Sequence, residues 1–471
     1  MREIDPATFE VVKNALYCAA EEMKVVLAKT AYSPLLKVAG DYSCGLFDVR
    51  GEMVAQGPDL PIHLGSMPLA VKAVIQAATT FEPGDVFIHN DPYFGGSHLP
   101  DVNVVTPAFH EGTLLGFACV RAHWPDIGSA TFEDFCDGDG ILDNGDKEDR
   151  PFWIRLRVDK RGDRLTVDFD GTDPQVPGPM NAPLNVTASG IYCAIKMIAD
   201  PGDLVPPNSG CWRPIALVAA PGTVVSAVSP APVVYANHEI SHRVCDMLFG
   251  AMAQLVPERV MACSQGTSAI LTLGGVDHRT GSRYVSYETI KGGFGARPTK
   301  DGITGVASGI SNTMNTPIEV LEMSFPVRVE RYAIVPDSGG PGRFRGGCGV
   351  ERVWRILGQP AHASVCLERT KSAPFGLAGG GAGAPGRIAV GGPDGAEREL
   401  VSKGAFTAAP DAEVRLRAPG SGGYGDPAAR DRARLRDDVV NGYVSPAAAA
   451  AAYGRGDASE LTCPVCRPGS A

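Results

Sequence analysis

The chain has 471 residues, 44% of them hydrophobic and 20% charged, which is typical of a globular protein of roughly two to four domains. Its net charge of -10 argues against nucleic acid or an anionic membrane surface as the main partner, because both attract basic proteins. No run of about 18 apolar residues occurs, and the first residues lack the apolar core of a secretory signal. We therefore expect a cytoplasmic protein with reduced cysteines.

The first third of the chain predicts an alternation of helices and strands. Apolar residues recur at helical spacing over residues 6–32, which predicts an amphipathic opening helix. Residues 44–56 predict a hairpin, and residues 66–80 predict a second helix with Ser66 as its N-cap. Residues 85–127 alternate short apolar strands with polar loops.

The rest of the chain predicts further strands joined by glycine-rich loops. Residues 137–150 are acidic and indicate a solvated loop, because the final glutamate of a calcium loop is misplaced there. Residues 152–171 alternate strictly, as a hairpin does. Beyond them we expect helices over 183–198 and 238–255, strands over 325–357 and 386–418, turns at Gly339–Gly349 and Gly379–Gly383, and a short helix with coil from about 430.

The densest polar cluster of the sequence lies in residues 89–101. His98 and Asp101 are separated there by two residues, so one turn can aim both side chains at one point. His123 ends an apolar strand, where a strand delivers a side chain to a site, and Asp41 precedes another strand. The sequence therefore predicts a site formed by His98, Asp101 and His123, to which Asp41 can add a fourth ligand.

Two histidines and two aspartates form a mixed nitrogen and oxygen ligand set. Such a set suits Zn, Mn or Fe(II) better than calcium, which prefers oxygen ligands alone. A metal held in this way polarises a carbonyl or lowers the pKa of a bound water. Asp126 and His89 are within reach as proton carriers or as partners of the ligands. The alternative is a hydrogen-bonded loop whose histidines have ordinary partners.

Other polar blocks leave alternatives open. The block 237–243 begins a helix whose first N–H groups either hold an anion or are simply capped. The glycine-rich stretch 288–297 contains basic residues but lacks the ending of a P-loop, which favours a tight turn over a phosphate cradle. Asn312, Thr313, Asn315 and Thr316 stand just before Pro317 and can cap a short helix. No G-x-S-x-G elbow occurs, which argues against a serine hydrolase.

Ten blocks, in family order and spread nearly from end to end, resemble the hydantoinase B/oxoprolinase family. The blocks are AGDYSCGLFD (39–48), LPIHLGSMP (60–68), HNDPYFGGSHLPDV (89–102), RAHWPDIG (121–128), VDFDGTDPQVPGPMN (167–181), ANHEISHRV (236–244), YETIKGGFGARP (287–298), SNTMNTPIEVLE (311–322), RYAIVPDSGGPGRFRGGCG (331–349) and GSGGYGDP (420–427). The family includes the B subunits of ATP-dependent hydantoinases, the C-terminal half of 5-oxoprolinase, and the corresponding subunit of acetone and acetophenone carboxylases.

The resemblance implies a divalent metal, namely Zn, Mn or Fe, that is held by Asp41, His98, Asp101 and His123. It also implies an A-type partner subunit of the sugar-kinase-like class that binds ATP, since this sequence shows no ATP motif. With the resemblance we expect substrate contacts from His63, Asn90, Glu288, Asn312 and Thr313, and proton transfer by Asp126 or His89.

The activity that the resemblance implies is the ATP-dependent hydrolysis of a cyclic amide such as a hydantoin or 5-oxoproline. Phosphorylation of the carbonyl oxygen would create the leaving group that such a stable ring lacks. The alternatives are the metal subunit of an ATP-dependent ketone carboxylase and a non-catalytic structural subunit. This sequence departs from the family pattern after Gly128. Relatives have a long helical segment at this position, whereas this chain runs almost directly into residues 130–135.

Helices and strands mix without the regular βαβ rhythm of a Rossmann fold. This predicts a mixed α/β (α+β) protein with several β-rich lobes and helices packed on them. We expect an N-terminal metal-site domain (1–130), a β-rich middle domain (131–235), a C-terminal α/β domain with Gly-rich loops (236–430) and a tail (431–471).

Overall fold

The structure is a computed structural model that describes residues 5–31, 34–37, 40–57, 59–96, 101–123, 151–161, 164–392, 396–400 and 403–454. The helices of this part are α1 (Pro6–Thr30), α2 (Pro34–Lys37), α3 (Met67–Ala77), α4 (Leu184–Ala199), α5 (Ser209–Trp212), α6 (Ile240–Met252), α7 (Ile318–Ser324), α8 (Arg432–Val440) and α9 (Pro446–Tyr453). Short 3-10 turns are η1 (Pro61–His63), η2 (Pro257–Arg259) and η3 (Pro427–Ala429).

The strands form several separate sheets, almost all of them antiparallel, so the predicted mixed α/β class is confirmed. The strands are β1 (Tyr42–Asp48), β2 (Met53–Gln56), β3 (Phe87–His89), β4 (Asp101–His110), β5 (Thr113–His123), β6 (Arg157–Arg161), β7 (Arg164–Asp168), β8 (Ile215–Val218), β9 (Ile270–Val276), β10 (Arg283–Thr289), β11 (Gly292–Gly293), β12 (Thr304–Val306), β13 (Val327–Ile334), β14 (Val350–Ile356), β15 (Ala361–Cys366), β16 (Arg387–Gly391), β17 (Glu397–Glu399), β18 (Lys403–Ala408) and β19 (Glu413–Arg417).

The four longer helices that the apolar spacing predicts are confirmed as α1, α3, α4 and α6. Both predicted hairpins are confirmed, although the second begins only at Arg157. Ser66 occupies the N-cap position of α3 as expected, but its hydroxyl accepts a hydrogen bond from the buried Arg121 and caps nothing. The tail is more helical than predicted, because it contains both α8 and α9. The acidic stretch 137–150 lies outside the described residues.

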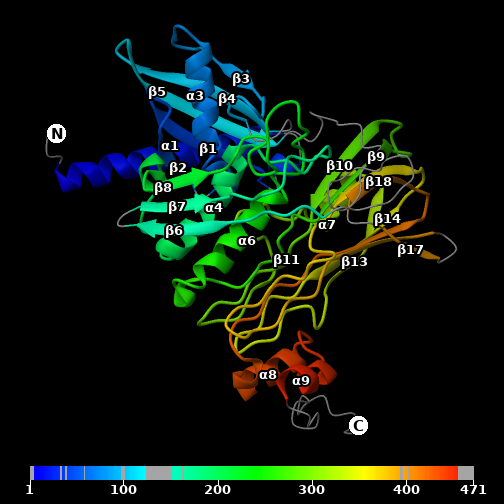
Figure 1. Cartoon of the computed structure of the whole chain (residues 1–471). Helices are drawn as coiled ribbons and strands as arrows, with labels where there is room; N and C mark the ends of the chain where they lie inside the picture. The colour runs from blue at the N-terminus through cyan, green and yellow to red at the C-terminus, as the bar shows by residue number, and fades with distance from the viewer. Residues whose placement is uncertain are drawn as a thin grey trace.

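The N-terminal sheet has the strand order β2-β1-β5-β4-β3, with α1 on one face and α3 on the other (Figure 1). Phe47, Val105 and Phe117 point from the sheet toward Met67 and Val71 of α3 in one apolar core. Successive residues of a strand face opposite sides, so residues two apart lie on the same face. A row of polar side chains therefore lies on the same face of the sheet as this apolar core. The row consists of Ser43, Asp101, Asn103, Arg121 and His123, which are all buried.

Helix α1 is the longest of the described helices, yet its only buried residue is Ala20. Its apolar side chains Phe9, Val11, Val12, Val25 and Val26 are exposed. Figure 1 shows α1 extending from the N-terminal sheet. No described helix has both the length and the apolar character that crossing a bilayer requires.

The apolar core behind α3 continues into α4 and α6, which pack against each other beside the sheet β6-β7-β8. A second core fills the space between two larger sheets, with the orders β10-β9-β15-β18 and β13-β14-β19-β16-β17. Leu271 and Val365 meet Trp354, Val414 and Leu416 there, as in a β-sandwich. The domain boundaries expected from the sequence stay a prediction.

The glycine-rich runs are mostly not the turns that the sequence analysis expects, although a turn does occur where Gly380 donates to the carbonyl of Leu377 at 2.9 Å and Gly379 has a φ of 92°. The segments 292–296, 338–349, 374–384 and 418–425 run extended and donate backbone hydrogen bonds to one another, for example from Gly423 to the carbonyl of Gly381 at 2.9 Å. None of the glycines between 339 and 349 has a positive φ. The prediction took glycine as a turn signal, whereas here the backbones approach too closely for a side chain.

Two contacts show how close these backbones lie. A Cβ on Gly295 would stand 1.8 Å from the carbonyl oxygen of Ala262, and one on Gly293 would stand 2.2 Å from that of Gly347. Real Cβ atoms do not approach backbone so closely, so only glycine fits these positions. We call these four extended segments the glycine bundle. The amide groups of Gly293 and Ala296 donate to carbonyls of the bundle, so they do not form a phosphate cradle.

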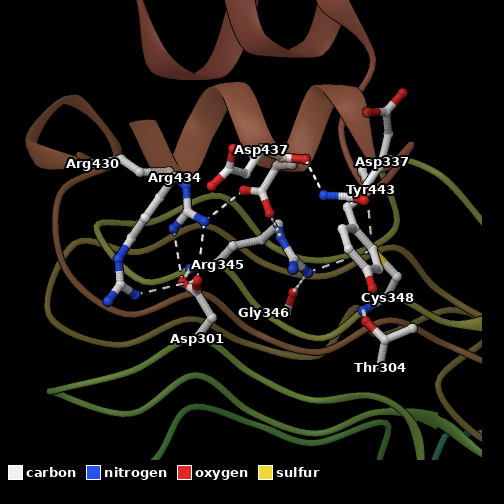
Figure 2. Close-up of polar contacts among 12 residues, drawn as sticks. Asp301, Thr304, Asp337, Arg345, Gly346, Cys348, Arg430, Arg434, Asp437 and Tyr443 are labelled. Atoms are coloured by element: carbon white, nitrogen blue, oxygen red, sulfur yellow. Dashed lines mark hydrogen bonds and ion pairs between the residues drawn. The ribbon is translucent and has the colours of Figure 1, made fainter. Parts of the chain in front are cut away.

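Helices α8 and α9 lie far from the N-terminal sheet, next to the glycine bundle (Figure 1). A buried cluster of ion pairs joins α8 to the bundle, as Figure 2 shows. The carboxylate of Asp438 accepts hydrogen bonds from Arg345 at 3.1 Å and from Arg430 at 2.5 Å. Arg430 also donates to Asp301 at 2.8 Å, and the guanidinium of Arg345 stacks on the ring of Tyr443.

Candidate functional site

A buried carboxylate lies between two imidazoles at the end of the N-terminal sheet. Asp101 begins β4 and pairs with His123, which ends β5. One oxygen of Asp101 lies 3.4 Å from Nδ1 of His123, and the other lies 3.6 Å from Nε2 of His63. His63 stands in η1, where its Nδ1 is 2.8 Å from the hydroxyl of Ser43. The strand register therefore sets Asp101 against His123, and the Ser43 contact orients the second imidazole.

Asp41 adjoins this group through the backbone, because the amide of His123 donates to the carbonyl of Asp41 at 3.1 Å. Asp41 and His63 line the same small cavity, whose volume is about 20 Å³. This is room for one water molecule or ion. The other polar residues around the cavity are Asn237, His238, His242, Ser268, Thr289, Ser311 and Thr313.

Two aromatic rings from other elements close the site around His123. The ring of Tyr287, on β10, lies 5.1 Å from that of His123, and the ring of His238 lies 5.8 Å from it. The hydroxyl of Tyr287 is 3.3 Å from Nε2 of His238. The site therefore lies where the N-terminal sheet, the start of α6 and β10 meet.

Burial and local charge set the protonation of the groups in this site. Burial opposes a charge on His123, but the hydrogen bond to Asp101 and the charge of Asp41 outweigh it and raise the pKa of His123. Burial, aided by the charge of Lys291, lowers the pKa of His242 to about 3. Burial also lowers the pKa of Lys291 to about 8, although the charges of Asp41 and Glu288 oppose this. The cavity wall thus includes a neutral imidazole, and the amine of Lys291, which donates a hydrogen bond at 2.8 Å to Thr289 of that wall, titrates close to neutral pH.

Several residues named from the sequence meet at this cavity, and others do not. Asp41, Asp101, His123 and His63 come together as described, and Thr313 lines the same cavity. The remaining candidates are placed elsewhere or lie outside the described residues.

His89 ends β3, and its Nε2 lies 3.2 Å from the carbonyl oxygen of Ala70, away from the cavity. Glu288 forms a buried ion pair with Arg352 at 2.8 Å. Asn90 follows His89, and Asn312 is exposed beside Thr313. His98 and Asp126 fall outside the described residues, so the predicted ligand set is described only in part.

The donor types present suit a divalent metal, since two carboxylates and one imidazole of the predicted set are buried together. Among the residues that the structure describes, however, no group of three or more His, Cys, Asp or Glu side chains is arranged to hold an ion. The missing member, His98, lies two residues beyond Gly96, in the short undescribed stretch 97–100. The metal and its ligands therefore stay a prediction.

Three residues of the site went unnoticed as candidates in the sequence. Tyr287 and Lys291 belong to the block 287–298, and His242 belongs to the block 237–243. Successive residues of a strand face opposite sides, so the sequence indicates that Tyr287 and Glu288 cannot both face the site, but not which of them does. Helix α6 begins at Ile240 with Glu239 as N-cap, and this side chain makes no capping hydrogen bond. His238 and His242 of this block line the cavity.

Comparisons of the sequence with known proteins all point to one family. The sequence profile of the Hydantoinase B/oxoprolinase family matches residues 5–138 and 128–427. A Pseudomonas protein named as the B-type component of a D-/L-hydantoinase is 28% identical over 96% of this chain and 95% of its own length. The beta subunit of the caprolactamase of Pseudomonas jessenii is 30% identical, covering 96% of both chains.

Solved structures also match this fold. The crystal structure of the ATP-dependent caprolactamase from Pseudomonas jessenii superposes with a TM-score of 0.86 at 27% identity, covering 98% of this chain and 99% of the other. The nucleotide-free structure of an acetone carboxylase gives a TM-score of 0.84, covering 96% of this chain and 80% of the other. At 17% identity, this second likeness concerns the fold alone.

The comparisons also bear on the departure after Gly128. The match to the caprolactamase protein extends over 571 residues, whereas this chain has 471, so the relative has at least 100 residues without a counterpart here. The two stretches matched by the family profile meet at residues 128–138, which places a break in the match there.

Proposed function

The chain belongs to the Hydantoinase B/oxoprolinase family, and on that basis we propose that it is the metal-binding subunit of an ATP-dependent enzyme that hydrolyses a cyclic amide. The observation that carries the proposal is the buried Asp101 carboxylate, flanked by His63 and His123 and adjoining Asp41. Two relatives are named as components of larger enzymes, one of a hydantoinase and one of a caprolactamase. This supports an A-type partner that binds ATP.

In this proposal Asp41, His98, Asp101 and His123 hold a divalent Zn, Mn or Fe ion. When bound, the ion would polarise a carbonyl or activate a water. His63 acts as a positioning residue, because its hydrogen bond to Ser43 leaves Nε2 facing Asp101. Such outer partners keep metal ligands in one orientation.

The other residues of the cavity suit the remaining steps. An amide in a small ring resists attack because its nitrogen donates electrons to the carbonyl, and ATP coupling removes this resistance by making the oxygen a leaving group. Thr313 and Ser311 provide hydroxyl groups at the wall of the small cavity, where they can hydrogen-bond a water molecule or an ion. His242 is neutral at pH 7, since its pKa is about 3, and can accept a hydrogen bond. Lys291 supplies a positive charge beside Asp41.

The test is Asp101→Asn in the chain reconstituted with its A-type partner. We expect metal content and ATP-dependent turnover of hydantoin, 5-oxoproline or caprolactam to fall about 100-fold. The matched control is Asp203→Asn, because the side chain of Asp203 is 81% exposed and forms a pair with Lys196 of α4. A variant that retains full metal and full turnover contradicts the proposed site.

The same reconstituted preparation distinguishes the proposed hydrolase from two other functions. The fold shared with an acetone carboxylase motivates an assay for incorporation of labelled bicarbonate into a ketone. Incorporation without amide hydrolysis would favour a carboxylase. A metal-free chain that still supports full turnover by its partner would favour a structural subunit.

A further inference from the structure

Helix α1 carries a stripe of mainly small and apolar side chains on the side that faces away from the N-terminal sheet. The opposite side of the helix packs on that sheet, where Met23 and Leu27 join the cluster around Tyr42 and Cys44. We call the outward side the α1 stripe, which consists of Val11, Val12, Ala15, Cys18, Ala19, Glu22, Val25, Val26 and Lys29. All of these residues are exposed except Ala19, which is partly exposed.

The α1 stripe repeats every seven residues. Its residues form three series with this spacing, namely Val11, Cys18 and Val25, then Val12, Ala19 and Val26, and then Ala15, Glu22 and Lys29. A repeat of seven keeps side chains on one side of a helix and is typical of helices that pair with another helix. The four valines are 48–68% exposed, and their transfer out of water would be favourable.

The α1 stripe also matches itself when its direction is reversed. A pair of valines stands at 11–12 and another at 25–26, and small residues lie around the midpoint beside Cys18. Two copies of α1 that pack antiparallel about this midpoint place the valines at 11–12 against those at 25–26 of the second copy. A different partner imposes no such symmetry, whereas the pairing of identical chains requires a surface that is complementary to itself.

The charges of α1 fit the same arrangement. In this register Lys29 faces Thr8 of the second copy, whose amide donates to the capping carboxylate of Asp5 at 3.0 Å. A basic helix end therefore meets an acidic helix start, and the two helix dipoles oppose each other favourably. A slip by one heptad would set Glu22 against Glu22 of the second copy, which like charge disfavours.

We propose that the α1 stripe is an interface between two copies of this chain, which pack their α1 helices antiparallel about a twofold axis beside Cys18. The interface removes the exposed valines from water, and the small side chains of Ala15, Cys18 and Ala19 let the two helices approach closely. An assembly with an A-type subunit would then contain this chain in pairs. The inference does not depend on the proposed metal site.

The first test is sedimentation velocity of the full chain over a range of concentrations. We expect a reversible dimer, and Val25→Glu should raise its dissociation constant about tenfold or more, because a charge then enters the apolar contact. Leu204→Glu is the matched control, since Leu204 is 84% exposed and lies outside α1; it should leave the dimer unchanged. A chain that stays monomeric up to its solubility limit, or a dimer that Val25→Glu does not weaken, overturns the proposal.

An exchange of charge tests the antiparallel register. Ala15→Glu sets a carboxylate against Glu22 of the second copy and should weaken the dimer about tenfold. The double variant Ala15→Glu, Glu22→Lys turns this repulsion into attraction and should restore the dimer. Weakening without restoration refutes the inference.

Cross-linking locates the contact. A short bismaleimide should join Cys18 of one chain to Cys18 of the second copy, which peptide mapping by mass spectrometry identifies. Cross-linked dimers that lack this link place the contact elsewhere and refute the inference. Protection of Cys18 from maleimide that appears only when the A-type subunit is added assigns the stripe to that subunit and also overturns the proposal.

Discussion

The ion pairs of Glu368 allow a quantitative prediction about stability. This carboxylate is only 19% exposed and binds both Arg243 and the fully buried Lys403. Burial alone would favour the neutral acid, but the charges of Lys403 and Arg243 outweigh it and lower the pKa of Glu368 from 4.5 to about 2. A shift of this size corresponds to about 3 kcal/mol of stability at pH 7.

An independent estimate agrees with this magnitude. Removing one partner of a buried ion pair typically destabilises a protein by about 3–5 kcal/mol, because the other charge remains buried alone. We therefore expect Glu368→Gln to lower the free energy of unfolding by about 3 kcal/mol at pH 7. Urea unfolding, followed by circular dichroism and by tryptophan fluorescence, measures the loss.

The pH dependence gives a sharper check. Because the folded pKa of Glu368 lies below its unfolded value, its contribution is complete above about pH 5 and is lost as the pH falls toward about 2. The difference between the wild type and Glu368→Gln should shrink over that range. Glu399→Gln is the matched control, since Glu399 forms an exposed pair with Arg387 that contributes at most about 1 kcal/mol. Equal losses in the two variants at pH 7 would refute the reasoning.

Three further predictions concern other parts of the chain. Asp438→Asn removes the carboxylate charge that the buried guanidinium groups of Arg345 and Arg430 share, although Arg430 keeps its pair with Asp301, so trypsin should cut near Arg434 about 100-fold faster, which mass spectrometry of timed digests measures. Gly295→Ala should prevent accumulation of folded protein, whereas Gly391→Ala, with no atom closer than 4.0 Å to the new Cβ, should be well tolerated in a solubility and unfolding assay. Arg121→Met removes the donor that holds Asn103 at 2.7 Å beside Asp101 and should weaken metal binding about 10–100-fold in a chelator competition.

Local patterns were sufficient to predict many of the elements. The spacing of apolar residues in α1 and α4 and the alternation in β6 and β7 are properties of short segments, so the sequence reveals them directly. The pairing of Asp101 with His123 is also nearly local, because both residues stand at the adjoining ends of one hairpin.

The rest of the site depends on contacts between distant segments. Tyr287 reaches His123 only because β10 and the N-terminal sheet meet in space, and no pattern around either residue encodes that contact. Neighbouring residues of β10 face opposite ways, so Tyr287 turns to the site while Glu288 turns to Arg352. The sequence names the right block there but does not indicate which of its side chains faces the cavity.

The glycine bundle has a consequence for the thermodynamics of unfolding. Its segments are joined by backbone hydrogen bonds, and positions such as Gly295 and Gly347 admit no side chain at their contacts. Exposure of apolar surface raises the heat capacity on unfolding, whereas exposure of peptide groups lowers it. Melting of this region should therefore contribute less to the heat capacity change, per residue, than melting of the sandwich beside it. Its stability should vary less steeply with temperature as a result.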